Sequence, residues 1–392
     1  MAEPWLSIIG LGEDGLAGLT SASRAALAAA EFIFGGARHL ERAGVQGRVW
    51  AVPFDLAPVL ALRGRNVAVL ASGDPFWHGV GGTLSAHLAP AEWRAFPAPS
   101  TFSLVAARLG WRLEEVICLG LHAAPLARLR PVLARGQRLI CLVRDGAAVA
   151  ELAFYLAAQG FGASTLWGME ALGGPREKVW KVRADRFAAG TIAAPVAVAI
   201  EAVGVGMARA SGLPDEMFEH DGQITKRAVR AMTLSALAPR PGEVLWDIGS
   251  GSGSVAIEFL LAATGSVAHA LEADPVRAAR ARGNAENFGL GHRYLVTEAR
   301  VPEGLADLPP PDVVFIGGGA SEAVLAAVWP VLPQGGRLVV NGVTLETEAL
   351  LIRWQGDKGG ALLRIELAEA GPLGSRRGWQ PLRPVVQWSA VR

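Results

Sequence analysis

Short apolar runs alternate with stretches of helical character along the first half of the chain. The apolar runs that predict strands are Trp5–Gly10, Val67–Ser72, Val116–Gly120, Arg138–Val143 and Pro195–Ile200. The stretches that predict helices are Ser21–Ala30, Ser103–Leu109 and Ala147–Gln159, the last followed by Gly160, a residue suited to ending a helix. This alternation is typical of an α/β domain.

The second half begins the same alternation again after an irregular segment. Ala202–Asp221 contains glycines, a proline and several acids without clear periodicity, so we predict two domains, residues 1–205 and 206–392. Strands are predicted at Val244–Ile248, Val267–Leu271, Val313–Ile316, Arg337–Val340, Ala361–Leu367 and Val385–Val391. Helices are predicted at Lys226–Leu237, Ser254–Ala263, Pro275–Phe288, Glu322–Val328 and Thr347–Gly356. This order predicts a Rossmann-like, doubly wound sheet that ends in an antiparallel pair.

Composition narrows the classes of partner. The 392 residues include 37 basic and 36 acidic side chains, and a net charge of +1 gives no sign of a nucleic-acid partner. The two cysteines, Cys118 and Cys141, lie in apolar runs, and no spacing of cysteines and histidines predicts a metal site. The sequence MAEPWLSIIG lacks the basic region and the apolar stretch that a signal peptide needs, and we expect no membrane span because no stretch of about 20 residues is apolar throughout. We therefore expect a soluble, cytoplasmic protein without a membrane partner.

A glycine-rich loop in the second half carries the first functional signal. A predicted buried strand leads into Asp247, Gly249, Gly251 and Gly253, and then directly into a helix. Glycines allow a sharp turn and a close approach of a ligand to the main chain, and a helix N-terminus offers free N–H groups. Asp247 is placed to hold an ammonium group. Glu272, at the end of the next strand, is placed to accept hydrogen bonds from ribose hydroxyls.

The spacing of these glycines favours S-adenosylmethionine as cofactor over a nicotinamide dinucleotide. A dinucleotide loop reads GxGxxG, whereas here the third glycine comes one position earlier and Ser254 follows it. No Gly-Lys-Ser/Thr follows, which excludes a phosphate-binding P-loop. A purely structural strand–turn–helix is the remaining alternative.

The turn after the predicted strand Val313–Ile316 indicates what kind of group accepts the methyl. It reads Gly317-Gly318-Gly319, where methylases of exocyclic base amines carry an Asn/Asp-Pro-Pro-Tyr/Phe turn. Because no catalytic amide or aromatic ring occupies this turn, we expect an acceptor with its own nucleophilicity, such as an electron-rich carbon. Gly317 is also a candidate for the cofactor site.

Motifs in the first half resemble the tetrapyrrole (corrin/porphyrin) methylase family. These motifs are Ile9–Gly15 with Leu19-Thr20, Ser72–Phe76 and Pro99–Ser103. The resemblance implies a two-lobed α/β domain that binds S-adenosylmethionine in a cleft between its lobes. The site residues that it implies are Gly73, Asp74, Ser100 and Thr101 for the cofactor, and Gly10 and Gly12 for the trough that receives the acceptor. A simple Asp-Pro turn and helix capping are the alternative roles of Asp74 and of Ser100 and Thr101.

The second half resembles the decarboxylating corrin methylases. Gly222–Lys226 precedes the first helix there and the glycine loop follows, which makes Thr225 a candidate for the cofactor and Lys226 for the substrate. A capping threonine and a solvated lysine are the alternatives. Fused in this order, the two halves resemble the bifunctional corrin methylases of the aerobic cobalamin pathway.

That resemblance implies a division of labour. The first domain would methylate C5 of the macrocycle, and the second would methylate C15 and remove the C12 acetate carboxyl as CO2. It implies one S-adenosylmethionine site per domain, a corrin-type tetrapyrrole substrate and self-association into a homo-oligomer. A methylase of RNA or protein, and a sensor that binds an adenosine ligand without turnover, are the alternative functions.

A substrate with many carboxylates gives arginines a role, since guanidinium groups bind carboxylates through two hydrogen bonds. Four arginines are candidates because they lie near glycines or on the helix beside the cofactor loop: Arg227, Arg230, Arg376 and Arg377.

Overall fold

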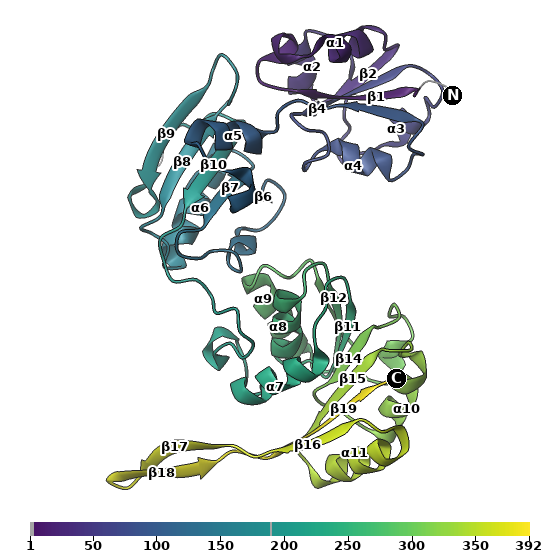
Figure 1. The fold of residues 1–392 in the computed structure, drawn as a ribbon, viewed down its shortest axis with the longest axis vertical. Coiled ribbons are helices and arrows are strands. Elements are labelled where there is room, and N and C mark those ends of the chain that lie inside the picture. Colours follow the sequence, from purple (N-terminus) through teal and green to yellow (C-terminus); the bar gives the residue numbers. More distant parts are fainter. Residues whose placement is uncertain (1–3, 189) are drawn as a thin grey trace. The chain divides into compact units, whose positions relative to one another are not determined.

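The computed structural model describes residues 4–188 and 190–392, and these fold into two compact units (Figure 1). The first unit comprises Met1–Leu126 and Val132–Gly206, and the second comprises Ala127–Pro131 and Met207–Arg392. Within the described residues, none of the helices combines the length and the apolar character needed to cross a membrane.

The first unit opens with a parallel sheet of strand order β3-β2-β4-β1-β5. Its strands are β1 (Leu6–Leu11), β2 (Phe32–Gly35), β3 (Arg48–Val49), β4 (Val67–Ser72) and β5 (Trp93–Phe96). Its helices are α1 (Ser21–Ala28), α2 (Ala37–Ala43), α3 (Ala57–Leu60) and α4 (Val80–Ser85). Figure 1 shows α1 and α2 on one face of this sheet and α3 and α4 on the other.

Two small cores explain why β1 and β4 are apolar along their whole length. Alternate residues of a strand point to opposite faces, so a sheet covered on both faces needs continuous apolar strands. Leu6, Ile8, Val67 and Val69 pack toward one face, whereas the intervening Ile9, Leu11, Ala68 and Leu70 pack toward the other. The predicted bounds of the strand Val67–Ser72 are confirmed, and all of its residues except Ser72 are buried.

A second sheet completes the first unit, with the strand order β6-β7-β10-β8-β9. Its strands are β6 (Val116–Gly120), β7 (Arg138–Leu142), β8 (Thr165–Glu170), β9 (Lys178–Arg183) and β10 (Val196–Glu201), and its helices are α5 (Thr101–Leu109) and α6 (Gly146–Ala158). Only the β6–β7 pair is parallel, and the other three pairs are antiparallel. The unit thus has two sheets, as the predicted two-lobed α/β domain requires.

The second unit is built on a seven-stranded sheet of order β13-β12-β11-β14-β15-β19-β16, in which β19 runs opposite to the other six strands. The strands are β11 (Val244–Ile248), β12 (Val267–Glu272), β13 (Tyr294–Glu298), β14 (Val313–Ile316), β15 (Arg337–Gly342), β16 (Ala361–Ile365) and β19 (Val385–Val391). The helices are α7 (Arg227–Leu237), α8 (Ser254–Ala262), α9 (Pro275–Asn287), α10 (Glu322–Val331) and α11 (Leu345–Lys358). This confirms the predicted Rossmann-like fold.

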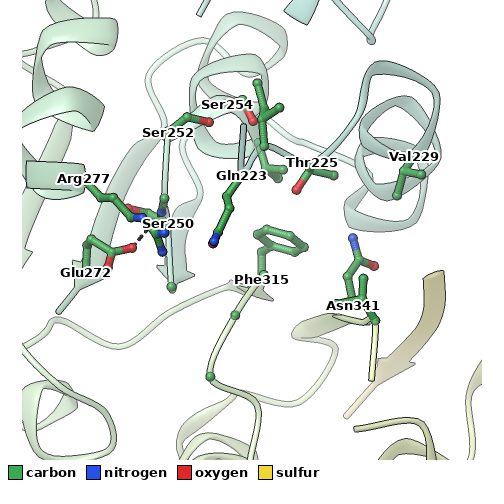
Figure 2. Close-up of a pocket in the computed structure, with 18 of the residues that line it drawn as sticks. Gln223, Thr225, Val229, Ser250, Ser252, Ser254, Glu272, Arg277, Phe315 and Asn341 are labelled. Carbon is green, nitrogen blue, oxygen red and sulfur yellow. Dashed lines mark hydrogen bonds between the residues drawn. The ribbon is translucent and has the colours of Figure 1, made fainter. Parts of the chain in front are cut away.

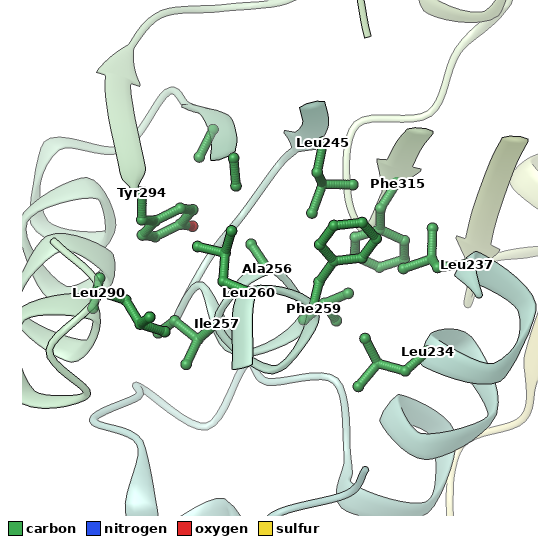
Figure 3. Close-up of a cluster of buried hydrophobic side chains, with 14 of the residues drawn as sticks. Leu234, Leu237, Leu245, Ala256, Ile257, Phe259, Leu260, Leu290, Tyr294 and Phe315 are labelled. Atoms are coloured by element: carbon green, nitrogen blue, oxygen red, sulfur yellow. The ribbon is translucent and has the colours of Figure 1, made fainter. Parts of the chain in front are cut away.

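The core of this unit again divides by strand alternation. On one face, Leu245 and Phe315 pack with α7, α8 and α9, and Figure 3 shows Phe259 of α8 between them and Leu234. On the other face, Trp246 and residues of α10 and α11 form a second cluster. The helices therefore cover both faces of the sheet. Because β11, β12, β14 and β15 are parallel, their carboxyl ends lie at one edge.

A two-stranded ribbon, β17 (Ala368–Leu373) and β18 (Arg376–Pro381), lies outside this sheet. The sequence pattern did not predict it, because most of its residues are small, polar or turn-forming and almost all of them are exposed, including Leu373 and Trp379. Figure 1 shows the ribbon extending away from the sheet of its own unit.

Candidate functional site

A cavity of about 1000 Å³ opens at the carboxyl ends of the parallel strands in the second unit. Ligands of open α/β sheets bind at this edge, where the strand order reverses on either side of one strand, here β11. The glycine loop, the segment Gly222–Lys226 and the turn Gly317–Gly319 all line it. Segments separated by more than 90 residues in sequence are thus brought to a single site, and Figure 2 shows several of their side chains around it.

The three glycines of the loop serve different purposes, although all have positive φ. A Cβ at Gly249 would press on the backbone of Gly318, so this glycine lets the loops after β11 and β14 meet. A Cβ at Gly253 would lie 2.8 Å from the hydroxyl of Tyr294, so this glycine packs inward and does not line the cavity. Gly251 has φ +57°, lines the cavity and would meet only one atom, the Gln223 carbonyl oxygen at 3.9 Å. The open side of the loop is therefore at Gly251.

Glu272 ends β12 and reaches the same loop. One of its carboxylate oxygens accepts a hydrogen bond from the Gly251 amide (2.9 Å) and the other accepts one from the Asp274 amide (3.0 Å). Each oxygen keeps capacity for a further donor. Glu272 lines the cavity, so its carboxylate faces the space beside the loop with its orientation fixed.

Asp247 lies at the end of β11, directly before the glycine loop. Its side chain is buried behind the glycine loop and does not line the cavity. Oδ2 accepts a hydrogen bond from the Tyr294 hydroxyl (3.1 Å), and burial raises the pKa of Asp247 to about 7. Its other oxygen, Oδ1, has no hydrogen-bond partner among the described residues, and a bond from Asp247 to the ammonium group of the cofactor, directly or through water, stays a prediction.

The segment before α7 brings Thr225 and Lys226 to the cavity, as the motif predicted, and adds Gln223. Figure 2 shows the side chains of Gln223 and Thr225 at the cavity. Asp221 anchors this segment, since its carboxylate pairs with Arg277 (2.9 Å) and Arg280 (3.2 Å) of α9. These ion pairs connect the segment before α7 to α9, the helix that follows Glu272.

Arg230 was the wrong choice among the candidate arginines. Its side chain is fully buried, where it pairs with Glu258 (2.6 Å) and Asp215 (3.0 Å) and donates to the carbonyls of Thr225 and Leu213. Arg230 thus bonds to protein groups in the core and does not line the cavity. The helical spacing that placed it beside the loop did not reveal that it points into the core.

The other predicted arginines do not line the cavity either. Arg227 donates to the Gly212 carbonyl (2.7 Å), and Arg376 and Arg377 lie on the β17–β18 ribbon. The arginines that do line it are Arg277, Arg300 and Arg383, none of which we proposed from the sequence. Arg383 lies between the ribbon and β19. Its position at the cavity depends on how β19 pairs in the sheet, which the local sequence does not indicate.

In the first unit, Gly10 and Gly73 lie at the ends of two adjacent strands, β1 and β4. A Cβ at Gly10 would overlap the carbonyl oxygen of Gly73 and lie 2.7 Å from the amide of Ala98. These backbones are linked, because Ala98 donates to Gly73 (3.2 Å) and Gly73 to Leu11 (3.1 Å). Both glycines are thus required by the close approach of three loops. At Gly12, the Asp14 carboxylate occupies the space that a Cβ would need.

The remaining predicted contacts of the first unit form local turns and caps. Asp74 accepts a hydrogen bond from the Phe76 amide (2.9 Å), which is the geometry of an Asp-Pro turn. Ser100 is buried and caps α5 by accepting from the Ser103 amide (3.1 Å), and Thr101 is the first residue of that helix. These bonds account for the local structure and do not test a role in binding.

Sequence reasoning missed a group of arginines at the Gly10–Gly15 loop. The nearly buried carboxylate of Glu13 pairs with Arg42 (2.9 Å), Arg176 (3.8 Å) and Arg38. Arg38 also donates to the Ser72 hydroxyl (3.1 Å) at the end of β4. Three arginines thus contact one carboxylate where the two predicted motifs meet, and Asp14 adds a second carboxylate to the same loop.

Comparison with known proteins adds the decisive observation. Residues 6–188 match the family model of tetrapyrrole (corrin/porphyrin) methylases, and residues 216–392 match that of the precorrin methyltransferase domain. The chain is 48% identical over 400 aligned residues to the precorrin-6Y C(5,15)-methyltransferase (decarboxylating) of a Sinorhizobium species, covering 99% of this chain and 97% of that protein. It belongs to the family of decarboxylating precorrin-6Y C5,15-methyltransferases.

Two further relatives carry the same name. The precorrin-6Y C(5,15)-methyltransferase (decarboxylating) of Mycobacterium tuberculosis is 37% identical over 98% of this chain and 99% of its own length. The crystal structure of the C-terminal domain of the Rhodobacter capsulatus precorrin-6Y C5,15-methyltransferase is 49% identical, covers 47% of this chain and all of that domain, and has a TM-score of 0.46. The predicted family and its class of activity, methyl transfer to carbon with decarboxylation, are confirmed.

Proposed function

We propose that this chain methylates precorrin-6Y at C5 and C15 and removes the carboxyl of the C12 acetate, giving precorrin-8 in cobalamin biosynthesis. The observation that carries the proposal is the cavity of the second unit, because its two ends differ in chemistry. Gly251, Glu272 and Arg300 lie toward β11 and β12. Phe315 comes from β14, Ile365 from β16 and Arg383 from the segment before β19. One end suits a nucleoside, and the other suits a flat apolar ring with acidic side chains.

S-Adenosylmethionine, one molecule per unit, would supply a methyl group on a positively charged sulfur. In the second unit, the residues that would hold it are Gly249, Gly251, Thr225, Gly317 and Glu272, with Glu272 facing the ribose hydroxyls. The open surface of Gly251 fits this role, since nothing but a distant carbonyl would meet a Cβ there. Asp247 and Gly253 would act from behind by fixing the loop.

For the acceptor, the chain supplies position and charge. Lys226 and Arg383 at the cavity would pair with carboxylates of the macrocycle, and Val229, Phe315 and Val385 would pack against the ring. When the C–C bond to the acetate carboxyl breaks, CO2 leaves and the electron pair passes into the conjugated ring. Apolar walls favour this step because a carboxylate is less well solvated there than in water. Holding the ring carbon against the methyl donor is the second contribution.

In the first unit, Gly73, Asp74, Ser100 and Thr101 would contact the cofactor, and the loop with Gly10 and Gly12 would face the macrocycle during methylation at C5. The charge at this loop supports the assignment, because three arginines, Arg38, Arg42 and Arg176, gather at the two carboxylates of the loop, Glu13 and Asp14. Carboxylates of the substrate would pair with these arginines.

A product assay tests the proposal. The purified full-length chain is incubated with precorrin-6Y and S-adenosylmethionine, and the product is analysed by mass spectrometry while evolved CO2 is trapped. We expect a gain of two methyl groups and release of one CO2 per macrocycle. A product without added methyl groups would contradict the proposal.

We further propose that the chain works in the cytoplasm as a homo-oligomer, without nucleic-acid or membrane partners. Support for the homo-oligomer comes from the β17–β18 ribbon, where Leu373 is 68% and Trp379 is 77% exposed. Large apolar side chains on an exposed ribbon are typical of surfaces that associate. Sedimentation of the full chain at several concentrations tests this, and a monomer at all of them would contradict it.

A further inference from the structure

A buried group of three polar side chains lies behind the acceptor end of the cavity. Asn341 is near the carboxyl end of β15, Gln387 is its register partner on β19, and Thr233 faces both from α7. Thr233 is fully buried, Gln387 is 4% exposed and Asn341 is 9% exposed. Only Asn341 also lines the cavity, where Figure 2 shows it together with Phe315 and Val229.

The hydrogen bonds of Thr233 settle the orientation of both amides. Its hydroxyl donates its single proton to the Val229 carbonyl (2.9 Å). It therefore accepts from the two amides, from Nδ2 of Asn341 (2.9 Å) and from Nε2 of Gln387 (3.1 Å). Gln387 also donates to Oδ1 of Asn341 (2.9 Å). A hydroxyl has one donor and two acceptor positions, so Thr233 is saturated and neither amide can turn over without losing bonds.

This network leaves capacity on one residue. An asparagine amide carries two N–H groups and a carbonyl oxygen with two lone pairs. Among the described residues, Nδ2 of Asn341 makes a single hydrogen bond, to Thr233, so its second N–H is available. The wall around it is apolar, with Val229, Phe315 and Val385 on other elements. Buried polar groups are almost always hydrogen-bonded, and an N–H held at the edge of an apolar cavity awaits a partner from the ligand.

We propose that Asn341 donates this N–H to a side-chain carboxylate of the acceptor, and that Thr233 and Gln387 position it for that bond. The inference rests on the proposed function, because the macrocycle supplies the carboxylate. A neutral donor suits this place, since it orients an acidic group within apolar walls without the strong electrostatic hold of an arginine. Asn341 thereby fixes which edge of the ring faces the methyl donor.

Steady-state kinetics of the full-length chain test the inference. Asn341→Leu replaces the amide with an apolar side chain of similar size. We expect the KM for precorrin-6Y in CO2 release to rise about tenfold or more, as loss of a hydrogen bond to a charged group predicts. Thr233→Val leaves Asn341 in place but frees its amide to turn, and we expect a smaller rise in the same KM. The dissociation constant for S-adenosylmethionine should change less than twofold in both variants.

A matched control separates binding from folding. Ser266→Ala also removes a fully buried hydroxyl with two hydrogen bonds from the second unit, but Ser266 does not line the cavity. We expect Ser266→Ala to lower the melting temperature and leave the KM unchanged. A wild-type KM in Asn341→Leu, or a parallel loss of S-adenosylmethionine affinity, would overturn the assignment. Failure of the wild-type chain to turn over precorrin-6Y would instead refute the proposed function, and this inference with it.

Discussion

Each unit ends a buried parallel strand in a glycine loop, and both loops have a glycine that close neighbouring backbone requires, but in the described residues only the loop of the second unit has a glycine that is open to a cavity. At Gly10 and Gly73 of the first unit, neighbouring backbones occupy the space that a side chain would fill. At Gly251 of the second unit that space is open and belongs to the cavity. A glycine motif in a sequence therefore does not by itself identify a ligand site. The surroundings of each glycine decide whether it serves chain packing or binding.

The comparison predicts that each unit can be damaged separately, and the largest effect is expected for Arg230→Met. This change leaves the Glu258 carboxylate buried without its cation, which costs about 3–5 kcal/mol of unfolding free energy. We expect the second unit to unfold at lower denaturant concentration in a two-step transition, while the first unit is unaffected. Arg282→Met, which breaks the exposed pair with Glu298, is the control and should cost less than about 1 kcal/mol. Equal effects of both changes would refute the structural role of Arg230.

Gly10→Val should damage the first unit alone, by roughly 3 kcal/mol, because its side chain would collide with two backbones. Gly44→Ala is the control, since Gly44 has positive φ but no atoms within 4 Å of a Cβ, and it should cost about 1 kcal/mol. Chemical denaturation followed separately for the two units measures both. If Gly10→Val were no worse than Gly44→Ala, the close packing of the first loop would be disproved.

Asp247→Asn should stabilise the second unit at neutral and higher pH. The carboxyl ionises near pH 4 when unfolded but near pH 7 when folded, so the folded state keeps a proton that the unfolded state has lost. Wild-type stability therefore falls as pH rises from about 4 to about 7 and is flat above, whereas the neutral amide avoids this loss. We expect the variant to gain at least about 1 kcal/mol at pH 8 and nothing at pH 3. Denaturation at both pH values checks this, and an equal effect at each would exclude the titration.

The smallest effect is expected at the rim of the cavity. Arg383→Gln removes an exposed cation, so the KM for precorrin-6Y should rise a few-fold at low ionic strength and converge with wild type in about 1 M salt. Arg353→Gln, on the exposed surface of α11, is the control. A salt-independent difference would argue against a carboxylate partner for Arg383.

In the described residues, the sequence predicted six of the seven strands in the sheet of the second unit, but only five of the ten strands in the first unit. Apolar runs such as Val67–Ser72 and Val244–Ile248 specify their strands directly, and the motif from Asp247 to Gly253 lies next to Glu272 because neighbouring parallel strands end at one edge. What it missed depends on distant partners. We did not predict strand β9, in which three cationic residues are mixed with three apolar ones, and it lies in the sheet through its antiparallel pairing with β8.

The same reason explains the errors at the site. Arg230 lies on the predicted helix, but only the packing of Glu258 against it shows that it points inward. Asn341 and Arg383 reach the cavity from β15 and from the segment before β19, about 90 and 130 residues after the glycine loop. A motif reports a local turn, whereas the acceptor end of the cavity is made almost entirely by tertiary structure.

The central claim is that one chain carries two methyl-donor sites, of which the second depends on the open face of Gly251. Titration calorimetry of the full chain with S-adenosylmethionine tests it most directly, with Gly251→Val as the variant and Gly283→Ala, at an open position on α9, as the control. We predict two sites per chain for the wild type and for Gly283→Ala, and one for Gly251→Val. A single site in the wild type, or two in Gly251→Val, would contradict the account.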